Sequence, residues 1–391
     1  MAGVLYAYLF LDDFVLLYPV YTLLFSDTGL SVWQISSLFV IWSVSSLLLE
    51  VPSGAWADAT SRRKLLIAGP LLTAVAFTLW VAAPGYWVFA LGFVLWGLKS
   101  ALTSGALEAL VYEELQRLRA TNRYATVMGR GQVAGVLAAT CSGAVAAPII
   151  SAGGFAAVGA ASVAASVIAS FVAMLFPEHR IRGADGPELG WADTLAAGTR
   201  EARRSASVRA AVILVAAVGS VWGALDEYTP LLIESGGVTA ADVALLMVVV
   251  WAGASAGGLA AGRVARWGST GFAALVAGGA VLMAAGALSR HPAGVLALAA
   301  AFGVFQCATI VADTRLQDSI TGPARATVTS LAGMSTDVAT LAVYSSYAAL
   351  VELSGHPGAF ALLMLPYLTI AFWLRSDGLK RRDQGTHNPC L

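Results

Sequence analysis

Four ionisable residues stand inside long apolar stretches of the sequence, where a charged side chain is costly to bury. They are Asp12, Asp13, Lys99 and Asp337. A carboxylate in an apolar environment can gain and lose a proton, and a lysine nearby favours its charged form. We expect Lys99 to pair with either Asp12 or Asp13, because pairing lowers the burial cost of both charges. The remaining acid would then be free to bind and release a proton.

Other residues that can do chemistry lie nearer the ends of apolar stretches or carry no charge. They are Asp226, Glu227, Arg130, Tyr8, Trp96, Trp222 and Gln306. Asp226 and Glu227 either titrate within their stretch or sit at the end of a helix, and the sequence leaves both interpretations open. The aromatic side chains can stack a flat ligand, although such residues more often form packing contacts or interface belts.

The composition places the chain among membrane proteins. Of its 391 residues, 58% are hydrophobic and only 12% are charged, and the mean hydropathy is +0.76. Soluble proteins carry about 25% charged residues, and one aqueous core cannot bury this much apolar surface. We therefore predict a multi-pass α-helical membrane protein. The formal net charge of zero gives no reason to expect a nucleic-acid partner, and three cysteines argue against a disulfide framework.

Twelve apolar runs are each long enough to cross a bilayer, which takes about 20 residues. The first six lie at 4–25, 32–53, 65–84, 86–110, 125–148 and 153–176. The other six lie at 208–232, 240–262, 270–289, 292–313, 326–350 and 357–375. These runs predict four parts: an N-terminal half over 1–176, a cytoplasmic linker over 177–207, a C-terminal half over 208–375 and a cytoplasmic tail over 376–391.

The positive charges lie almost entirely in alternate loops. With a cytoplasmic N-terminus, the inner side receives the cations of 62–64, 117–123, the linker and the tail, whereas the outer side receives only Arg290. Because Lys and Arg are enriched in cytoplasmic loops, we predict that both termini are cytoplasmic. The richness in Ala, Gly and Arg is typical of a high-GC bacterium, which indicates the plasma (inner) membrane of a bacterium.

The two predicted halves repeat one another. Residues 111–127 follow the fourth run and residues 311–328 follow the tenth, and both segments begin with valine and end in Ala-Thr-Val after an arginine. Glu113 and Asp313 occupy matching positions in the two segments. The loop after the second run has a degenerate counterpart after the eighth. Internal repeats in an apolar chain are typical of secondary transporters.

Three short motifs resemble those of a known transporter family. The stretch Gly54-x-x-x-Asp58-x-x-Ser61-Arg62-Arg63-Lys64 resembles the signature loop between helices two and three of the major facilitator superfamily. Residues 325–333 are similar to the start of helix eleven in bacterial efflux members of that family, and residues 104–115 to the end of helix four. The Gly-Pro motif that drug–proton antiporters often carry in helix five is missing from residues 129–143.

The resemblance implies a fold and a place for the substrate. The fold is an all-α membrane protein with twelve transmembrane helices in two pseudo-symmetric six-helix halves. Helices one, four, seven and ten line a central cavity in this family, so Asp12, Asp13 and Lys99 would face it from helices one and four. We expect the protein to work as a monomer.

The signature loop also predicts an inner gate. Gly54 lets the backbone turn tightly and lets a neighbouring helix approach. By resemblance, Asp58 faces the start of helix eleven, where a helix dipole presents partial positive charge. Glu50 either belongs to the same inner gate or titrates in the cavity.

The cations of the loop have two interpretations. Arg62 and Arg63 can reach a carboxylate in forked geometry, and Glu108 at the inner end of helix four is the expected partner. In the other interpretation these arginines and Lys64 only set the topology, which we favour for Lys64. A latch of this kind would hold the halves together in one facing state and break in the other.

The sequence indicates a transporter and not an enzyme. The four histidines lie in loops or the tail without metal-ligand spacing, and no Walker-type loop is present. We therefore expect no metal, no cofactor and a proton gradient as the energy source. The expected partners are a small-molecule substrate, protons and membrane lipids.

Two transport functions fit these residues. The first is proton-coupled export of small amphipathic molecules such as a drug or natural product, by alternating access. The alternative is proton-coupled uptake or exchange of a polar metabolite, which would call for more convergent polar groups than Gln306 and its neighbours supply. A third hypothesis is a receptor without transport or a lipid scramblase. A receptor should carry a sizeable soluble domain, and a scramblase would need a polar groove open to lipid.

Overall fold

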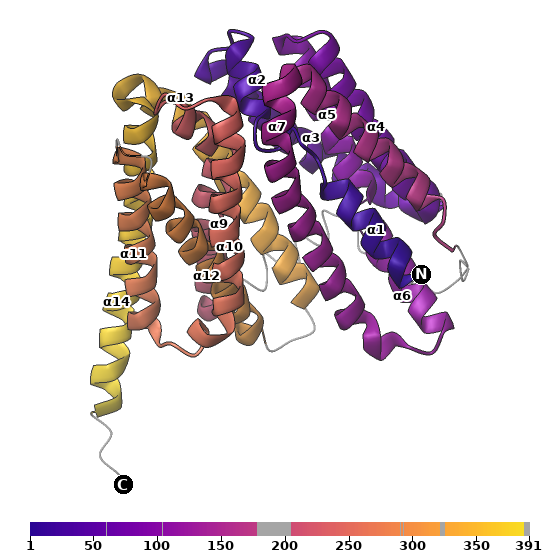
Figure 1. Ribbon diagram of the computed structural model, residues 1–391. Helices are drawn as coiled ribbons and strands as arrows, with labels where there is room; N and C mark the ends of the chain where they lie inside the picture. Colours follow the sequence, from indigo (N-terminus) through magenta and orange to yellow (C-terminus); the bar gives the residue numbers. More distant parts are fainter. Residues whose placement is uncertain are drawn as a thin grey trace. The chain divides into compact units, whose positions relative to one another are not determined.

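The computed structural model describes residues 1–59, 61–103, 105–177, 205–289, 291, 293–320 and 325–386. Of residues 50–59, 125, 325–327 and 377–386 it describes the backbone alone. Regular structure within these residues is helical throughout (Figure 1). The predicted linker 177–207 lies almost wholly outside the described residues, as does the end of the predicted tail, 387–391.

The chain divides into two compact units. The first comprises Met1–Glu188 with Thr239–Val248, and the second comprises Leu189–Val238 with Val249–Leu391. The first unit contains α1 (Ala2–Asp13), α2 (Tyr21–Asp27), α3 (Val32–Ala59), α4 (Arg62–Ala82), α5 (Tyr86–Thr103), α6 (Ala106–Arg117), the 3-10 helix η1 (Thr121–Arg123) and α7 (Tyr124–Ala173). The second contains α9 (Ala206–Glu234), most of α10 (Ala240–Val264), α11 (Ser269–Leu288), α12 (Gly294–Ser319), α13 (Arg325–Leu362) and α14 (Leu365–Thr386).

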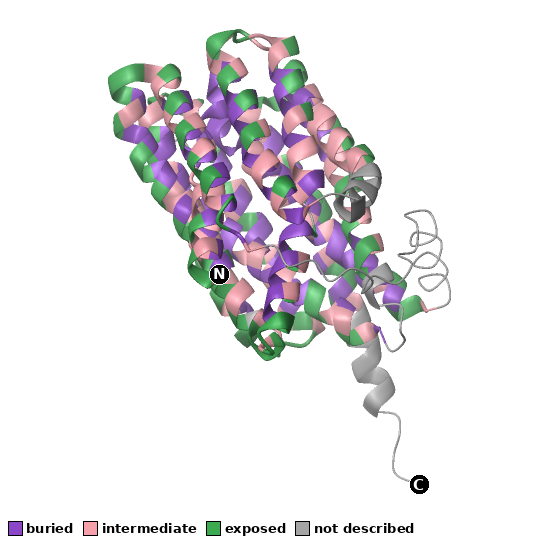
Figure 2. Cartoon of the chain, turned by 90° about the vertical axis from the view of Figure 1, so that its right-hand side faces the viewer, coloured by how far each residue is buried: buried purple, intermediate pink, exposed green. Residues whose placement is uncertain are grey.

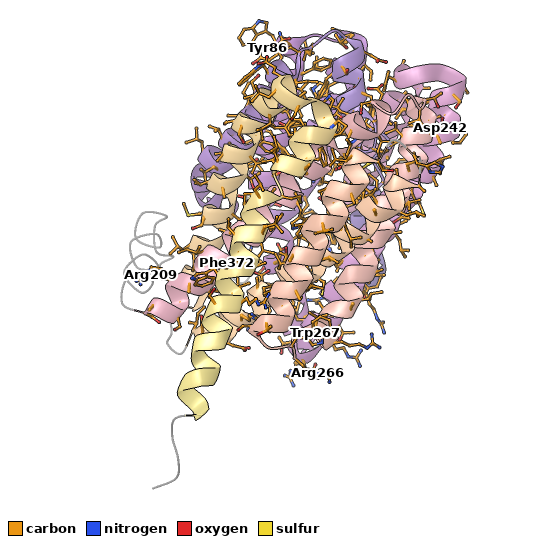
Figure 3. The ribbon with its side chains drawn as sticks, turned by 90° about the vertical axis from the view of Figure 1, so that its left-hand side faces the viewer. Tyr86, Arg209, Asp242, Arg266, Trp267 and Phe372 are labelled. Atoms are coloured by element: carbon orange, nitrogen blue, oxygen red, sulfur yellow. The ribbon has the colours of Figure 1, made fainter. Side chains whose placement is uncertain are left out.

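Each unit is a helix bundle. In the first unit α7 packs against α1 and α4, and α5 packs against α3 and α4. In the second unit α9 packs against α12 and α13, and α11 packs against α12, α13 and α14. Buried and exposed residues alternate along the helices (Figure 2). Large apolar side chains remain on the outside, among them Trp87 of α5 and Leu259 of α10. Phe372 of α14 is another (Figure 3). Such an apolar outer surface suits contact with lipid.

Helix α10 crosses α12 at very short range. Gly253 and Gly257 of α10 lie directly on the backbone of Ala299 and Gly303, and a Cβ on either glycine would overlap that backbone. Helices in a membrane gain little from the hydrophobic effect between them, so small residues spaced by four provide close van der Waals contact instead. The glycines are therefore required for the packing of the second unit.

The helices are consistent with twelve membrane crossings. Among the described residues, nine stretches are long and apolar enough to cross a bilayer. Two of these, Thr121–Ala173 and Val328–Ser376, have 53 and 49 residues, which is about twice the length that one crossing takes. Each folds back at a glycine with positive φ, Gly154 at 62° and Gly355 at 69°, a conformation that other residues adopt at a cost. The pair α1 and α2 supplies the remaining crossing.

The first predicted run, 4–25, is broken in the middle. Helix α1 ends at Asp13, and α2 begins at Tyr21. Pro19 lies in the gap. A proline lacks the N–H that a continuing helix needs, and it also disfavours helical geometry at the residue before it. Asp12 and Asp13 consequently lie at the end of a helix and not in its interior.

Two further boundaries differ from the prediction. The run 86–110 is divided between α5 and α6, and Gly105 has a φ of 71° at the division. Helix α3 continues to Ala59, so the backbone at Gly54 is helical and not a tight turn as predicted. The change of direction comes just before α4, where the Ser61 hydroxyl accepts a hydrogen bond from the Lys64 N–H at 3.1 Å. Serine favours this capping position because it satisfies a free N–H of the first turn.

Candidate functional site

An ion pair joins α1 to α5 inside the first unit. The Lys99 ammonium donates a hydrogen bond to Asp12 Oδ2, with 2.8 Å between nitrogen and oxygen. The side chains of Lys99 and Asp12 are 14% and 15% exposed, so the pair is shielded on most sides. The structure thus brings together the lysine and one of the two adjacent acids, and it selects Asp12 as the paired one.

The position of the pair explains why a lysine is needed. Asp12 and Asp13 are the last residues of α1. The C-terminal end of a helix carries partial negative charge from its free carbonyl groups. Two carboxylates at that end are repelled by the carbonyls and by each other. The ammonium of Lys99 offsets this repulsion, so the end of α1 depends on a cation supplied by α5.

Asp13 lies outside the pair and against α7. Its carboxylate is so close to Gly135 that a Cβ on this glycine would overlap Oδ2. Adjacent residues on a helix point about 100° apart, which is why the two acids contact different helices. Gly135 was not among the predicted site residues, since its role depends on a contact between α1 and α7 that the sequence does not display.

An aromatic stack lies one helical turn from Lys99. Trp96 of α5 stacks on Tyr18, with ring centroids 5.4 Å apart and planes at 2°. It also stacks on Trp42 of α3, at 5.2 Å and 27°. Tyr18 belongs to the non-helical segment between α1 and α2. Trp96 was among the predicted site residues, whereas Tyr18 and Trp42 were not. The break that places Tyr18 against Trp96 was not predicted.

Tyr8 was predicted to line the cavity, and the structure places it in a hydrophobic core instead. Its side chain is 2% exposed and belongs to a cluster with Leu5, Leu110 and Phe176. The Tyr8 and Phe176 rings meet edge to face at 5.5 Å. This arrangement buries a large aromatic area, which stabilises the contact of α1 with α6. Tyr8 is therefore a packing residue of the first unit.

Three predicted acids lie on α9 and α13 of the second unit, namely Asp226, Glu227 and Asp337. Asp226 accepts a hydrogen bond from the indole N–H of Trp251 on α10, at 3.2 Å. It lies well before the end of α9, so it is held by a neighbouring helix and does not mark a helix end. Glu227 is half-buried next to Asp226 on α9. The side chain of Asp337 is exposed on α13.

Trp222 on α9 is fixed by polar groups of its own unit. Its backbone N–H donates to the Tyr367 hydroxyl at 3.0 Å, and its indole N–H donates to Thr309 Oγ1 at 3.1 Å. The Tyr367 hydroxyl donates in turn to the Val218 carbonyl at 2.8 Å. Thr309 and Tyr367 were not predicted, because a hydroxyl in an apolar run carries no signal of its own. Gln306 lies half-buried on α12.

The inner-gate motif forms an ion pair with a different acid from the predicted one. Arg62, the first residue of α4, pairs with Glu113 on α6, and their side chains are 11% and 17% exposed. Glu108 is exposed in the first turn of α6. The prediction of Glu108 assumed one continuous helix over 86–110. Because the chain starts a new helix after Gly105, the register of α6 presents Glu113 to Arg62.

The rest of the motif has mixed outcomes. The Arg63 guanidinium donates to the Phe176 carbonyl at 3.4 Å. Arg130, which was predicted in the cavity, is exposed on α7. Glu50, Gly54 and Asp58 lie on α3, where the structure describes only the backbone at these positions. The predicted contact of Asp58 with helix eleven therefore stays a prediction.

In the second unit, the connection between α10 and α11 corresponds to the one before α4, and it is contacted by an arginine of α12. Arg315 of α12 donates to the Trp267 carbonyl at 3.1 Å, and its guanidinium lies 4.3 Å from the centroid of the Phe272 ring. Trp267 follows Arg266 in the connection between α10 and α11 (Figure 3). In the first unit the cation, Arg62, is the first residue of the helix that follows the connection, α4. Each unit thus has an arginine at the corresponding connection, which lies on α4 in the first unit and on α12 in the second.

The comparison of the sequence with known families decides the assignment. The sequence pattern that defines the Major Facilitator Superfamily matches residues 3–343. The chain belongs to the Major Facilitator Superfamily. This membership makes it a multi-pass membrane transporter for a small-molecule substrate, and not an enzyme. Among the described residues, no group of three or more His, Cys, Asp and Glu side chains is placed to hold a metal ion.

Solved structures of superfamily transporters share the fold. The nucleoside transporter NupG has a TM-score of 0.77 at 12% identity and covers 97% of this chain and 98% of its own. An inward-facing, unoccupied bacterial homologue of the human lysosomal transporter Spinster has a TM-score of 0.70 at 14% identity, covering 97% and 94%. A D-xylose–proton symporter has a TM-score of 0.67 at 16% identity, covering 95% of each chain. No curated protein matches the chain by sequence.

Proposed function

We propose that this superfamily member is a proton-coupled secondary transporter in which Asp13 carries the proton. The observation that carries the proposal is the Asp12–Lys99 ion pair. This pair uses the charge of one acid and leaves the adjacent carboxylate on a separate contact with α7. Two neighbouring acids in unlike surroundings are suited to unlike roles, one structural and one titrating. The proton gradient supplies the energy, and no cofactor takes part.

Movement of the lysine provides the coupling. Burial disfavours the charged form of a carboxylate, and a nearby ammonium favours it. A change in the distance between Lys99 and Asp13 therefore changes how tightly Asp13 holds a proton. In an alternating-access cycle, this distance differs between the two facing states. The proton is then taken up on one side of the membrane and released on the other.

The proposed direction is export of small amphipathic molecules such as a drug or natural product. The side chains next to the ion pair are the aromatic rings of Tyr18, Trp42 and Trp96, and ligand sites of this kind are mostly apolar with a few polar groups. The second candidate is proton-coupled uptake or exchange of a polar metabolite. It is favoured by the similar structures, which include a nucleoside transporter and a D-xylose–proton symporter.

A growth panel with and without expression of the protein tests the direction. Export makes cells resistant to a toxic substrate, whereas uptake makes them sensitive or lets them grow on a nutrient. A substrate found in this way is then followed in inverted membrane vesicles with an imposed pH gradient, acidic inside. Export by exchange with protons predicts accumulation in these vesicles. Accumulation only in right-side-out vesicles would favour the second candidate.

We propose that the protein is a monomer in a bacterial plasma membrane with both termini in the cytoplasm. A reporter that is active only inside cells, fused after Leu391, should be active. A reporter that is active only outside, inserted at Gly236 between α9 and α10, should also be active. The opposite pattern at either site would contradict the proposed orientation.

Gly135→Ala should impair coupling, because the new methyl group would overlap Asp13 Oδ2. Displacing a reacting group by about 1 Å can cost about 100-fold in rate, so we expect a loss of roughly tenfold or more in gradient-driven transport. The pH dependence should change as well, since the carboxylate moves relative to Lys99. The measurement is transport against pH in vesicles.

Gly129→Ala is the matched control for this substitution. It lies on the same helix, and a Cβ there meets nothing within 4 Å. Equal insertion of both variants into membranes shows that folding is intact. If Gly135→Ala keeps both the rate and the pH profile of Gly129→Ala, the contact between Gly135 and Asp13 has no role in coupling.

Removing one partner of the Arg62–Glu113 pair should lower stability. A hydrogen bond to a charged group is worth about 1.5–3 kcal/mol, and the partner left behind stays largely buried. We expect Arg62→Ala and Glu113→Ala each to lower the melting temperature of the purified protein by several degrees. The exposed Glu108→Gln serves as control and should change stability by less than about 0.5 kcal/mol. A larger effect of Glu108→Gln than of Glu113→Ala would contradict the observed pairing.

A further inference from the structure

We propose that Tyr18, Trp42 and Trp96 form a binding site for a planar aromatic or heteroaromatic ring that carries a hydrogen-bond acceptor. This inference rests on the proposed transport function and names the class of substrate. The three residues come from three different segments of the first unit: the break between α1 and α2, α3 and α5.

The stack is buried at Trp96 and partly exposed at its two outer rings. Trp96 is 8% exposed, and behind it lie the rings of Phe77 at 5.6 Å and Phe93 at 6.0 Å. Tyr18 and Trp42 are both half-buried. A ring held in place by neighbours loses little conformational freedom when a ligand stacks on it. The outer rings therefore offer preformed flat surfaces to a flat ligand.

The indole N–H of Trp42 is a buried donor with no hydrogen-bond partner among the described residues. Other tryptophans of the chain differ in this respect. Trp80 donates to the Phe89 carbonyl at 3.2 Å, and Trp222 and Trp251 donate to Thr309 and Asp226. An unsatisfied buried donor is unfavourable. A ligand acceptor such as a ring carbonyl oxygen would satisfy it, whereas a saturated apolar chain would satisfy neither this donor nor the stack.

The stack adjoins the residues of the proposed proton site. Trp96 and Lys99 are three positions apart on α5, so they lie on the same face of the helix. Lys99 holds Asp12, and Tyr18 lies in the segment that leaves Asp13. A ring bound against this stack therefore lies close to the ion pair, so that ring binding and proton binding can influence each other.

Binding measurements on the purified full-length protein test the proposal without requiring transport. The probes are 2-quinolone and caffeine, which are planar and carry ring carbonyl oxygens. Decahydroquinolin-2-one is the comparison, because it keeps the carbonyl of 2-quinolone and loses the flat ring. Calorimetry should show that at least one planar probe binds about tenfold or more tightly than the saturated compound.

Two substitutions separate the two parts of the site. Trp42→Phe keeps a ring and removes the N–H, so affinity for the planar probe should fall about 2- to 10-fold, the range for one neutral hydrogen bond. Tyr18→Leu should abolish the preference for the planar probe over its saturated analogue, and Tyr18→Phe should retain it. Trp87→Phe on α5 is the control, because Trp87 is 79% exposed and lies outside the stack.

The outcomes distinguish this site from the proposed proton coupling. If neither planar probe binds, or if Trp42→Phe and Tyr18→Leu bind both kinds of probe as Trp87→Phe does, the site is refuted. If the probes bind as expected but a substrate gradient moves no protons through the wild-type protein, the binding site stands and the coupling proposal fails. Asp13→Asn should still bind the planar probe, because the carboxylate is not part of the stack.

Discussion

Asp13→Asn is expected to abolish accumulation of substrate against its gradient, so that the ratio of inside to outside concentration falls to one. Asparagine keeps the size of the side chain at the end of α1 and cannot carry a proton. The contact with Gly135 is preserved, since the two side chains have nearly the same shape. The variant should still exchange substrate down a gradient, with a weaker dependence on pH. The assay is transport in sealed vesicles with an imposed pH gradient.

Two related variants make this prediction specific. Asp27→Asn, an exposed residue at the end of α2, should transport as the wild type does. Asp12→Asn removes the partner of Lys99, so the lysine is free to turn to Asp13, and coupling should be impaired although a titratable acid remains. If Asp13→Asn, Asp12→Asn and the double variant all still concentrate substrate, the coupling group lies elsewhere, with Glu50 or Asp337 next in line.

Lys99→Ala is expected to move the pH optimum of transport upward by about one to three units. Loss of a cation within reach of a carboxylate makes proton binding more favourable by this order. The end of α1 would then carry two carboxylates against the helix dipole without a counter-charge, so one acid holds its proton to higher pH. At neutral pH the variant should release protons poorly and transport slowly. A profile of transport rate against pH measures the shift.

Lys99→Arg is the matched variant, because it keeps the positive charge next to Asp12. Its pH optimum should stay near that of the wild type, even if the rate falls from the larger side chain close to Gly69. A Lys99→Ala variant with an unchanged pH optimum would show that the ion pair is structural only. An optimum that moves downward would contradict the electrostatic account altogether.

The charged site was largely predictable, because isolated charges in apolar runs stand out in a sequence. Asp12, Asp13 and Lys99 were recognised in this way, as was the tendency of the lysine to pair with an acid. Which acid it pairs with was not predictable, since the answer depends on where α1 ends. Helix α1 ends at Asp13, within a break that extends past Pro19, and a count of apolar residues does not register a break inside a run.

The errors at the inner gate have the same origin. Run lengths predicted the crossings well, but they assumed that each run is one straight helix. The chain instead restarts after Gly105, and this change of register moves the partner of Arg62 from Glu108 to Glu113. Gly54 was taken as a turn because glycine permits one, yet the backbone of α3 continues through it. Glycine allows a turn without requiring it.

The aromatic residues were the least predictable part. Tyr8 and Trp96 are both buried, but the structure places Tyr8 in an apolar cluster with Phe176 and Trp96 in a stack beside the ion pair. What separates them is the helix face that each occupies in the folded bundle. Hydrophobic periodicity is too weak to reveal that face in chains that are apolar on every side.

Proton movement driven by a substrate gradient tests whether transport is coupled to protons through Asp13. Proteoliposomes containing the wild-type protein and an internal pH-sensitive dye are given a gradient of an identified substrate and no initial pH gradient. We predict a change of internal pH as the substrate moves, and no such change with Asp13→Asn although the substrate still moves. Substrate movement without any pH change in the wild type, or an undiminished pH change with Asp13→Asn, would contradict this prediction.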